Sequence, residues 1–271
     1  MPTKPISPGR AYWLLITAAY RAQLQYRGNF LMITVGGLAY QGIGLAFVWV
    51  LVEQFGSLGH WTMGEIAFLY GMRLTAHALW TVPMNQLNLF DWVLREGEFD
   101  RYLVRPVGPL MQLLTRKLSV EVAGDMIGGL GLLIAAACVA PVDWSAAAVG
   151  MLFAAVVGGA MVEASLQLFI CSFSFRVLST RTLRFQIDGI FNNFGGYPLK
   201  VFPSGVRFAL TFLMPLAFVA YLPATALLER TDELSVSPWL ATSAPLAGPV
   251  LLALAYQMWR LQLRHHTSTG T

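Results

Sequence analysis

The sequence predicts an all-α protein that crosses a membrane several times, and three observations carry this prediction. Hydrophobic residues make up 56% of the 271-residue chain, and charged residues make up only 12%. Soluble domains carry about 25% charged residues. The apolar residues also lie in long runs, and about 20 of them in a helix cover the roughly 30 Å hydrocarbon core of a bilayer. Barrel strands are shorter and alternate in polarity, so residues 1–271 are expected to form one helical membrane domain.

Hydropathy divides the chain into candidate spans. The clearest run is residues 30–52, which contains no charged residue. Four further spans are predicted at residues 63–82, 118–140, 144–175 and 239–259. In front of the first run, residues 10–27 combine basic residues with apolar residues at helical spacing, which predicts an amphipathic helix in the membrane interface. The alternative is that these residues simply extend the first span.

The distribution of charge predicts the topology. The loop of residues 83–117 and the C-terminal tail are rich in Lys and Arg, whereas the loops on the other side are mostly acidic. Because an excess of Lys and Arg marks the cytoplasmic side, both termini and the 83–117 loop are predicted to be cytoplasmic. This placement accounts for the net charge of +4 without a nucleic-acid partner. The basic residues concerned are Arg95, Arg101, Arg105, Arg116, Lys117, Arg260 and Arg264.

Residues 176–228 allow two topologies. In the first, residues 176–205 form a cytoplasmic amphipathic loop and residues 206–228 are the fifth span. In the second, the more polar residues 183–201 are the fifth span, and residues 203–228 form a re-entrant hairpin in the outer leaflet, broken at Pro215 and Pro223. The charge rule mildly favours the first reading, because the second places Lys200 and Arg207 outside.

Small residues recur at four-residue spacing in two of the predicted spans. Such ladders let membrane helices approach closely, although Gly and Ala are also simply common in membrane helices. The ladders are Ala146, Gly150, Ala154 and Gly158 in the fourth span, and Gly124 and Gly128 in the third.

Charged residues crowd the loop between the second and third spans, and they surround an apolar knob of Phe99, Tyr102 and Leu103. Gly97 permits a turn between two short helices, and Asp91 with Arg95 and Glu98 with Arg101 have the spacing of helical ion pairs. A short helix of this kind suits docking into a groove on another protein. The alternative is a solvated loop that only obeys the charge rule. The residues are Arg95, Glu96, Gly97, Glu98, Phe99, Asp100, Arg101 and Tyr102.

Ionisable residues also occur inside the predicted spans, where each is costly unless it faces the bundle interior or water. They are Arg73, His77, Glu121, Asp125 and Glu163. One interpretation is a polar substrate path; the other is a fixed structural cluster in which opposite charges neutralise each other around Arg73.

The sequence contains no site for chemistry. It lacks G-x-x-x-x-G-K-[ST], so it has no P-loop for a nucleotide, and it also lacks H-E-x-x-H and G-x-S-x-G. The His residues lack metal-ligand spacing, and Cys138 and Cys171 are expected to be small buried hydrophobes. We therefore predict a protein that is not an enzyme and holds neither a cofactor nor a metal.

Three segments together resemble one family. They are residues 94–106, LREGEFDRYLVRP, residues 197–224, YPLKVFPSGVRFALTFLMPLAFVAYLPA, and the tail with Trp259-Arg260 and Ser268-Thr269-Gly270. They resemble permeases of type-2 ATP-binding-cassette (ABC) exporters, in the branch described as ABC-2 family transporters, over nearly the whole chain.

The resemblance implies six spans per subunit in a bacterial inner (plasma) membrane, with an F-P…P-L segment on the outer side. It therefore favours the second topology, with residues 203–228 as the hairpin. It also implies two permease subunits, alike or different, and two cytoplasmic ATPase subunits that hold ATP and Mg²⁺ and drive export. On this view residues 95–102 form the coupling helix, with Phe99 and Tyr102 filling a groove of the ATPase. One alternative is a secondary transporter. Two related halves in the sequence would favour this assignment, but we find no internal repeat. The other alternative is a membrane assembly factor.

Overall fold

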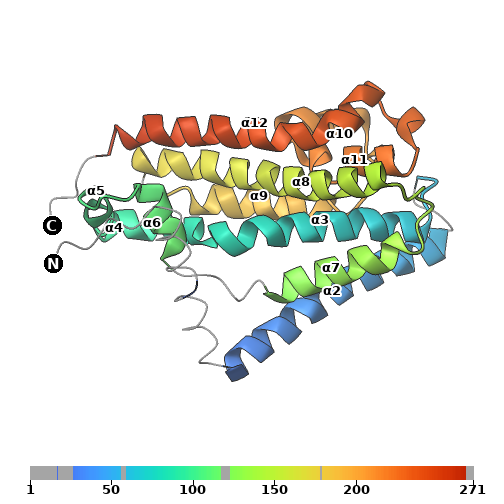
Figure 1. Ribbon diagram of the computed structural model, residues 1–271, viewed down its shortest axis with the longest axis horizontal. Helices are drawn as coiled ribbons and strands as arrows, with labels where there is room; N and C mark the ends of the chain where they lie inside the picture. Colours follow the sequence, from blue (N-terminus) through green and yellow to red (C-terminus); the bar gives the residue numbers. More distant parts are fainter. Residues whose placement is uncertain (1–16, 18–26, 56–58, 117–122, 178, 267–271) are drawn as a thin grey trace.

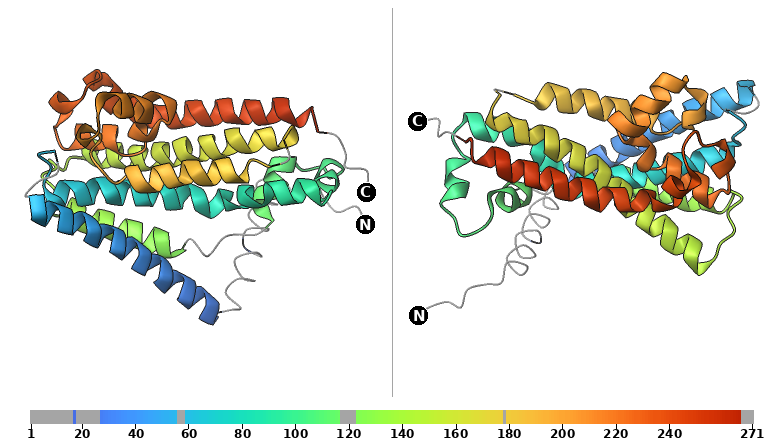
Figure 2. Two further views of the ribbon diagram at one scale, coloured as in Figure 1. Left: turned by 180° about the vertical axis from the view of Figure 1, so that it is seen from behind. Right: turned by 90° about the horizontal axis from the view of Figure 1, so that it is seen from above.

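The described part of the protein is entirely helical and elongated. The computed structural model describes residue 17 and residues 27–55, 59–116, 123–177 and 179–266, and it contains no strand within them. The predicted interfacial helix, residues 10–27, lies almost entirely outside the described residues. Helices α3, α8, α9 and α12 run side by side along the long axis, while α2 and α7 lean away from this bundle (Figures 1 and 2).

Within the described residues, six helices of 14 or more residues are joined by shorter ones. The long helices are α2 (Arg27–Phe55), α3 (Met63–Met84), α7 (Ala123–Ala137), α8 (Ala146–Ser172), α9 (Arg181–Phe194) and α12 (Pro238–Leu263). Between α3 and α7 lie η1 (Asn85–Leu89), α4 (Phe90–Arg95), α5 (Asp100–Leu103) and α6 (Pro109–Thr115). The remaining pieces are η3 (Phe173–Phe175), η4 (Leu199–Val201), α10 (Ser204–Phe208), the π-helical η5 (Ala209–Leu213), η6 (Leu216–Phe218), α11 (Tyr221–Leu227) and η7 (Thr231–Glu233).

Two helices of the described chain are long and apolar enough to cross a membrane, namely Ala146–Phe175 and α12. The predicted spans at residues 30–52 and 63–82 fall within α2 and α3, and α7 covers residues 123–137 of the predicted span at 118–140. The helical class of the fold is therefore confirmed, whereas the full set of six spans stays a prediction.

The ambiguous region does not form one continuous span. Helix α9 ends at Phe194, so it has 14 residues rather than the 19 predicted at residues 183–201. Its length of about 21 Å is shorter than the hydrocarbon core. The chain turns at Gly195 and Gly196, and Pro198 then precedes the short η4. Helix α9 lies along α8, with Arg184, Ile187 and Phe191 buried and with Leu183 and Phe185 exposed (Figure 2).

The predicted break at Pro215 is present. Residues 204–213 and residues 216–227 form two helical arms that meet at 73°, and together they are as apolar as a broken span or a re-entrant loop. Pro215 lies at the bend, where the missing backbone N–H costs nothing. Pro223, by contrast, does not break its helix, because it lies in the first turn of α11, where no intrahelical N–H donor is needed.

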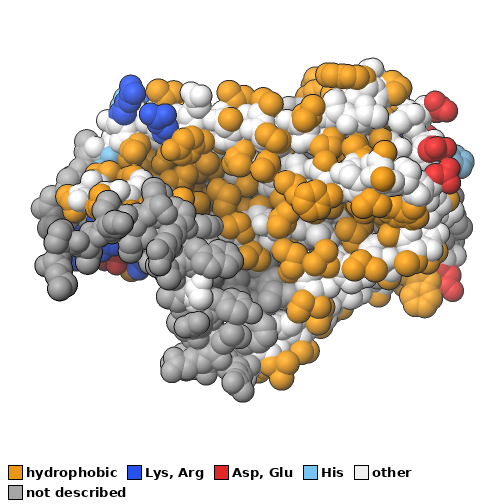
Figure 3. Space-filling model, in the orientation of Figure 1, with side chains coloured by type: hydrophobic (Ala, Val, Ile, Leu, Met, Phe, Trp, Pro, Cys, Tyr) orange, Lys and Arg blue, Asp and Glu red, His pale blue; other side chains and the backbone are white. Residues whose placement is uncertain are grey.

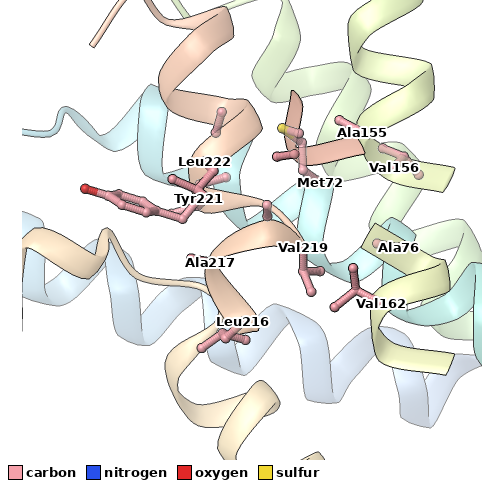
Figure 4. Packing of buried hydrophobic residues seen from close by; sticks show 14 of the residues in the cluster. Met72, Ala76, Ala155, Val156, Val162, Leu216, Ala217, Val219, Tyr221 and Leu222 are labelled. Atoms are coloured by element: carbon pink, nitrogen blue, oxygen red, sulfur yellow. The ribbon is translucent and has the colours of Figure 1, made fainter. Parts of the chain in front are cut away.

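The larger apolar core joins this bent segment to the bundle. Met72 and Ala76 of α3 and Val162 of α8 pack with Val219 and Leu222 of the bent segment, and all five side chains are buried (Figure 4). The bent segment is thus packed against the bundle.

Close approach of backbones holds α8 to α12. A Cβ added at Gly158 would lie 2.5 Å from the backbone oxygen of Pro245, and one added at Gly248 would overlap the backbone of Gly158. A Cβ at Gly124 would likewise lie 2.6 Å from the backbone oxygen of Thr34, which joins α7 to α2. Gly128 in turn approaches Leu38. The predicted packing roles of Gly124, Gly128 and Gly158 are therefore confirmed.

The first part of the other ladder was predicted wrongly. Ala146, Gly150 and Ala154 are exposed, and a Cβ added at Gly150 would meet nothing within 4 Å. The reason is geometric: α12 meets α8 at Gly158, whereas Ala146, Gly150 and Ala154 lie on an exposed side of α8.

Charge is separated along the long axis. On the face shown in Figure 3, Lys and Arg side chains gather at the end where α12 finishes, and Asp and Glu side chains gather at the opposite end, with hydrophobic side chains between them. The first end also carries α4, α5 and α6 (Figure 1).

Candidate functional site

The first candidate site is the α4–α5 segment, residues 90–103, at one end of the bundle. Its two short helices are joined by a turn in which Gly97 has a φ of 68°, a left-handed conformation that favours glycine. The turn predicted at Gly97 is therefore present. The segment folds back against the ends of α8 and α12, so it is part of the bundle's packing rather than a free loop.

Aromatic side chains fix the segment to the bundle. Phe90 and Phe99 contact each other with ring centroids 5.5 Å apart, and both pack against Phe175 and Trp259. Phe99 is fully buried in this cluster, and Tyr102 is 9% exposed. The prediction of a projecting apolar knob is therefore wrong for Phe99 and Tyr102, whereas its third residue, Leu103, is exposed. The prediction considered residues 95–102 alone, whereas the aromatic partners of Phe99 come from the ends of α8 and α12, which are distant in the sequence.

Asp91 ties the segment to the start of α9. Its carboxylate accepts hydrogen bonds from the Ser174 hydroxyl at 2.5 Å, the Ser179 hydroxyl at 2.8 Å and the backbone N–H of Arg181 at 2.8 Å. Burial opposes ionisation, but these hydrogen bonds and the Arg184 guanidinium 3.6 Å away outweigh it, so the pKa of Asp91 lies below its ordinary value. The carboxylate is thus a fixed negative charge at the N-terminus of a helix, where the backbone dipole favours an anion.

Arg184 closes this arrangement from the side of α9. It is 1% exposed, and its guanidinium also donates to the backbone oxygen of Leu87 in η1. Sequence reasoning did not single out Arg184 or the inward role of Asp91. Two signals in the sequence could have indicated this contact. One is Asp91, an acidic residue in a predicted short helix, and the other is the group of hydrogen-bond donors Ser174, Ser179 and Thr180, which lie within seven residues of one another.

The predicted ion pairs within the segment do not form. The Arg95 side chain donates to the backbone oxygen of Asp91, because the Asp91 carboxylate points toward α9. Glu98 pairs with Arg116 at 2.9 Å rather than with Arg101. Asp100 meets His266 at 2.8 Å, beyond the end of α12.

The outer face of the segment carries Leu103 from the predicted knob together with other apolar side chains. Leu103, the last residue of α5, is 46% exposed, and Val104 directly after it is 84% exposed. Trp92 is also exposed, and the Arg116 guanidinium lies over its ring at 5.1 Å. Arg95, Glu96, Arg101 and Arg105 are exposed around them. The surface is therefore an apolar patch with a largely basic rim.

The second candidate site is the buried charge cluster. His77 of α3 contacts Glu163 of α8 through Nδ1 and Oε2 at 2.7 Å, and the Arg73 guanidinium lies 3.8 Å from the other Glu163 oxygen. The indole N–H of Trp80 also donates to Glu163 at 2.8 Å. Arg73, His77 and Glu163 are all at least nine-tenths buried. The structure thus brings together three of the five residues predicted from the spans.

The other two predicted members are not part of this cluster. Asp125 of α7 accepts a hydrogen bond from the Gln41 side chain at 3.0 Å instead. Glu121 lies outside the described residues. Asp188 of α9 joins the cluster, with a carboxylate oxygen within 4.8 Å of ligand atoms of His77 and Glu163. Sequence reasoning did not single out Asp188, although an acidic residue inside a predicted span carries the same signal as Glu163.

A third group of charges lies at the opposite end and holds the bent segment. Arg230 binds Glu65 of α3 at 2.7 Å and Glu233 at 2.8 Å, and Lys200 reaches Glu233 at 3.4 Å. Burial acts against ionisation of Glu233, but hydrogen bonds from Trp61 and Lys200 outweigh it, so the pKa of Glu233 lies below its ordinary value. These residues connect the chain after α11 to the start of α3.

The comparisons with known proteins point to one family. A family model described as ABC-2 family transporter protein matches residues 38–270, which include all three candidate groups. No curated protein and no solved structure matched the chain. The match covers well over half of the chain and agrees with the resemblance of residues 94–106 and 197–224. The chain is therefore a member of the ABC-2 transporter family, a family of membrane permease subunits of ABC transporters.

Proposed function

We propose that the chain is the transmembrane subunit of an ATP-driven exporter and forms half of the substrate pathway. A separate cytoplasmic ATPase subunit binds ATP and Mg²⁺ and performs the hydrolysis, since this sequence has no P-loop. The pathway is completed by a second permease subunit, either a copy of this chain or a related one. The chain itself catalyses no reaction and needs no cofactor.

The observation that carries this proposal is the rigid attachment of the α4–α5 segment. Phe90 and Phe99 pack against Phe175 and Trp259 at the ends of α8 and α12, and Asp91 holds the start of α9. A movement of the segment must therefore move three long helices, because packed aromatic side chains transmit displacement with little compression. A segment with this attachment is suited to carry a power stroke from an ATPase into the bundle.

The exposed patch supports a specific docking mode. Leu103 and Val104 would enter a groove of the ATPase, and Arg101 and Arg105 would set its orientation at the rim. This differs from the role predicted for Phe99 and Tyr102, which instead hold the segment in shape. Residues 95–102 remain the proposed coupling element, with the contact surface displaced toward residues 103–105.

The proposed topology has six spans in a bacterial inner membrane, both termini in the cytoplasm and residues 203–228 as an outer hairpin. The separation of basic and acidic side chains along the long axis supports the orientation (Figure 3). The 73° bend near Pro215 supports the hairpin over a simple fifth span at residues 206–228.

Purification and reconstitution test the proposal. The tagged chain should co-purify with an ATPase subunit, and the complex in liposomes should hydrolyse ATP and export substrate only when that ATPase carries an intact P-loop. Matched liposomes with an ion gradient but without ATP should remain inactive. Transport driven by the gradient alone, with no ATPase bound, would contradict the proposal and support a secondary transporter.

A further inference from the structure

The buried charge cluster has one negative charge too many. Arg73 supplies a permanent positive charge, whereas Glu163 and Asp188 supply two carboxylates. With neutral His77, the sum is −1. The helix rise places His77, Glu163 and Asp188 about 10–14 Å from the near ends of α3, α8 and α9, inside the hydrocarbon core on the proposed topology. An uncompensated charge at that depth is costly.

The space between these side chains is too small for a water molecule, so only a very small positive group can neutralise the extra negative charge. Ligand atoms of His77, Glu163 and Asp188 lie within 4.8 Å of one another. Glu163 is 3% exposed, yet its Oε1 has no hydrogen-bond partner within the described chain. Asp188 also makes no hydrogen bond or ion pair with the described residues. Glu163 and Asp188 line the same narrow cleft beside Gln167, which has no space for a water-sized sphere.

We propose that His77, Glu163 and Asp188 form a binding site for a single proton, which makes the buried cluster electrically neutral. The 2.7 Å contact between His77 Nδ1 and Glu163 Oε2 already requires a proton between these atoms, because two bare acceptors would repel. The bound proton is a second one, shared between His77 and the carboxyl of Asp188. It bridges α9 to the pair formed by α3 and α8.

A proton fits the site better than a metal ion does. A divalent cation would change the net charge from −1 to +1 and would lie close to Arg73, whose guanidinium is 3.8 Å from Glu163. A hydrated cation also needs space for water, which the cleft does not provide. The proton restores neutrality without occupying volume.

The neighbouring charged groups do not supply the missing charge. Arg184 lies one turn before Asp188 on α9, but it faces Asp91 and Leu87. Asp125 of α7 is bound to Gln41. The groups that face the site are Arg73 and His77 from α3, Glu163 from α8 and Asp188 from α9.

Proton release would weaken the attachment of α9. Two ionised carboxylates would then face each other across less than 4.8 Å, and like charges at that distance repel. The folded state thus holds a proton that the unfolded chain gives up at neutral pH. Linkage then requires the stability of the fold to decrease as the pH rises.

The test compares thermal unfolding of the full chain in lipid nanodiscs from about pH 5 to about pH 8. The wild type and the exposed control Asp232→Asn should lose stability in parallel as the pH rises. Asp188→Asn should give a flatter profile, because the amide is uncharged at every pH. Equal slopes for Asp188→Asn and the wild type would overturn the proposal. Stoichiometric Zn²⁺ binding by the wild type that is lost in Asp188→Asn would also overturn it, in favour of a metal site.

A second measurement needs no variant. Dicyclohexylcarbodiimide adds to protonated carboxyl groups in apolar surroundings, and peptide mass spectrometry locates the adduct. Asp188 should be modified near pH 5 and progressively less toward pH 8, while Asp232 should not react at either pH. Absence of modification at Asp188 near pH 5 would overturn the proposal even if the Asp188→Asn variant failed to fold. Neither measurement depends on whether the chain exports a substrate.

Discussion

The carboxylate of Asp91 accepts a hydrogen bond from the backbone N–H of Arg181 at 2.8 Å, so a residue of α4 caps a helix that begins 90 residues later. Helix α9 has no cap of its own, because the side chain of its N-cap residue, Thr180, makes no capping bond. This contact makes the position of α9 depend on the α4–α5 segment. It is the polar counterpart of the aromatic packing of Phe99.

The Asp91 contact predicts a large loss of stability in Asp91→Asn. The amide carries no charge, so Arg184 would be left buried without its ion-pair partner, and breaking a buried pair costs about 3–5 kcal/mol. Chemical unfolding in detergent should report this difference. The control Asp143→Asn, at an exposed position, should stay within about 0.5 kcal/mol of the wild type. An Asp91→Asn protein as stable as the control would show that the cap contributes little.

The same residue predicts a dependence on acid. The pKa of folded Asp91 is lowered from 3.8, so its contribution to stability is present above about pH 3.8 and is lost as the pH falls through the lower, folded-state pKa. The wild type should therefore lose stability below about pH 3.8 more steeply than Asp91→Asn, which has no carboxylate at this position. Unfolding curves of both proteins at a series of acidic pH values provide the measurement. Parallel curves would mean that Asp91 titrates alike in the folded and unfolded states.

The contact between α8 and α12 predicts opposite outcomes for two glycines of one helix. Gly158→Ala would place a methyl group 2.5 Å from the Pro245 oxygen, so the helices must separate, and overpacking of this kind costs about 1–3 kcal/mol. Gly150→Ala meets nothing within 4 Å and should be neutral or slightly stabilising, because Ala favours helix. Melting temperatures of the two variants in the same detergent decide the matter. Equal melting temperatures would contradict the packing described for Gly158.

The proposed outer hairpin predicts labelling from outside at Gly205→Cys. Gly205 and Gly108 are both exposed, and a Cβ at either position meets nothing within 4 Å, so both cysteines are tolerated sterically. Cys138 is exposed rather than buried as predicted, so it is replaced by Ser. In this Cys138→Ser background, a membrane-impermeant thiol reagent should modify Gly205→Cys in intact cells. It should reach Gly108→Cys only after the membrane is opened. Labelling of Gly205→Cys only after the membrane is opened would contradict the hairpin and favour the topology in which residues 206–228 are the fifth span.

The residues of the α4–α5 segment show what can be predicted from sequence and what cannot. The two short helices and the turn at Gly97 follow from local signals, since glycine and helix spacing act within a few residues. The burial of Phe99 does not, because its partners Phe175 and Trp259 are 76 and 160 residues away. The same limit explains Asp188: its meeting with His77 depends on how α9 packs beside α3. Charges inside spans were found wherever hydropathy defined the span clearly, as for Arg73 and Glu163.

The affinity of the co-purifying ATPase for the permease in nanodiscs tests the central claim most directly. Val104→Asp places a charge in the proposed apolar contact, and Val104 is 84% exposed, so the fold of the permease itself should be unaffected. We predict at least about tenfold weaker binding, equivalent to about 1.4 kcal/mol. Val139→Asp, at a position 73% exposed at the opposite end of the bundle, should bind the ATPase as the wild type does. Wild-type affinity for a correctly folded Val104→Asp protein would contradict the account of the α4–α5 segment as the coupling element.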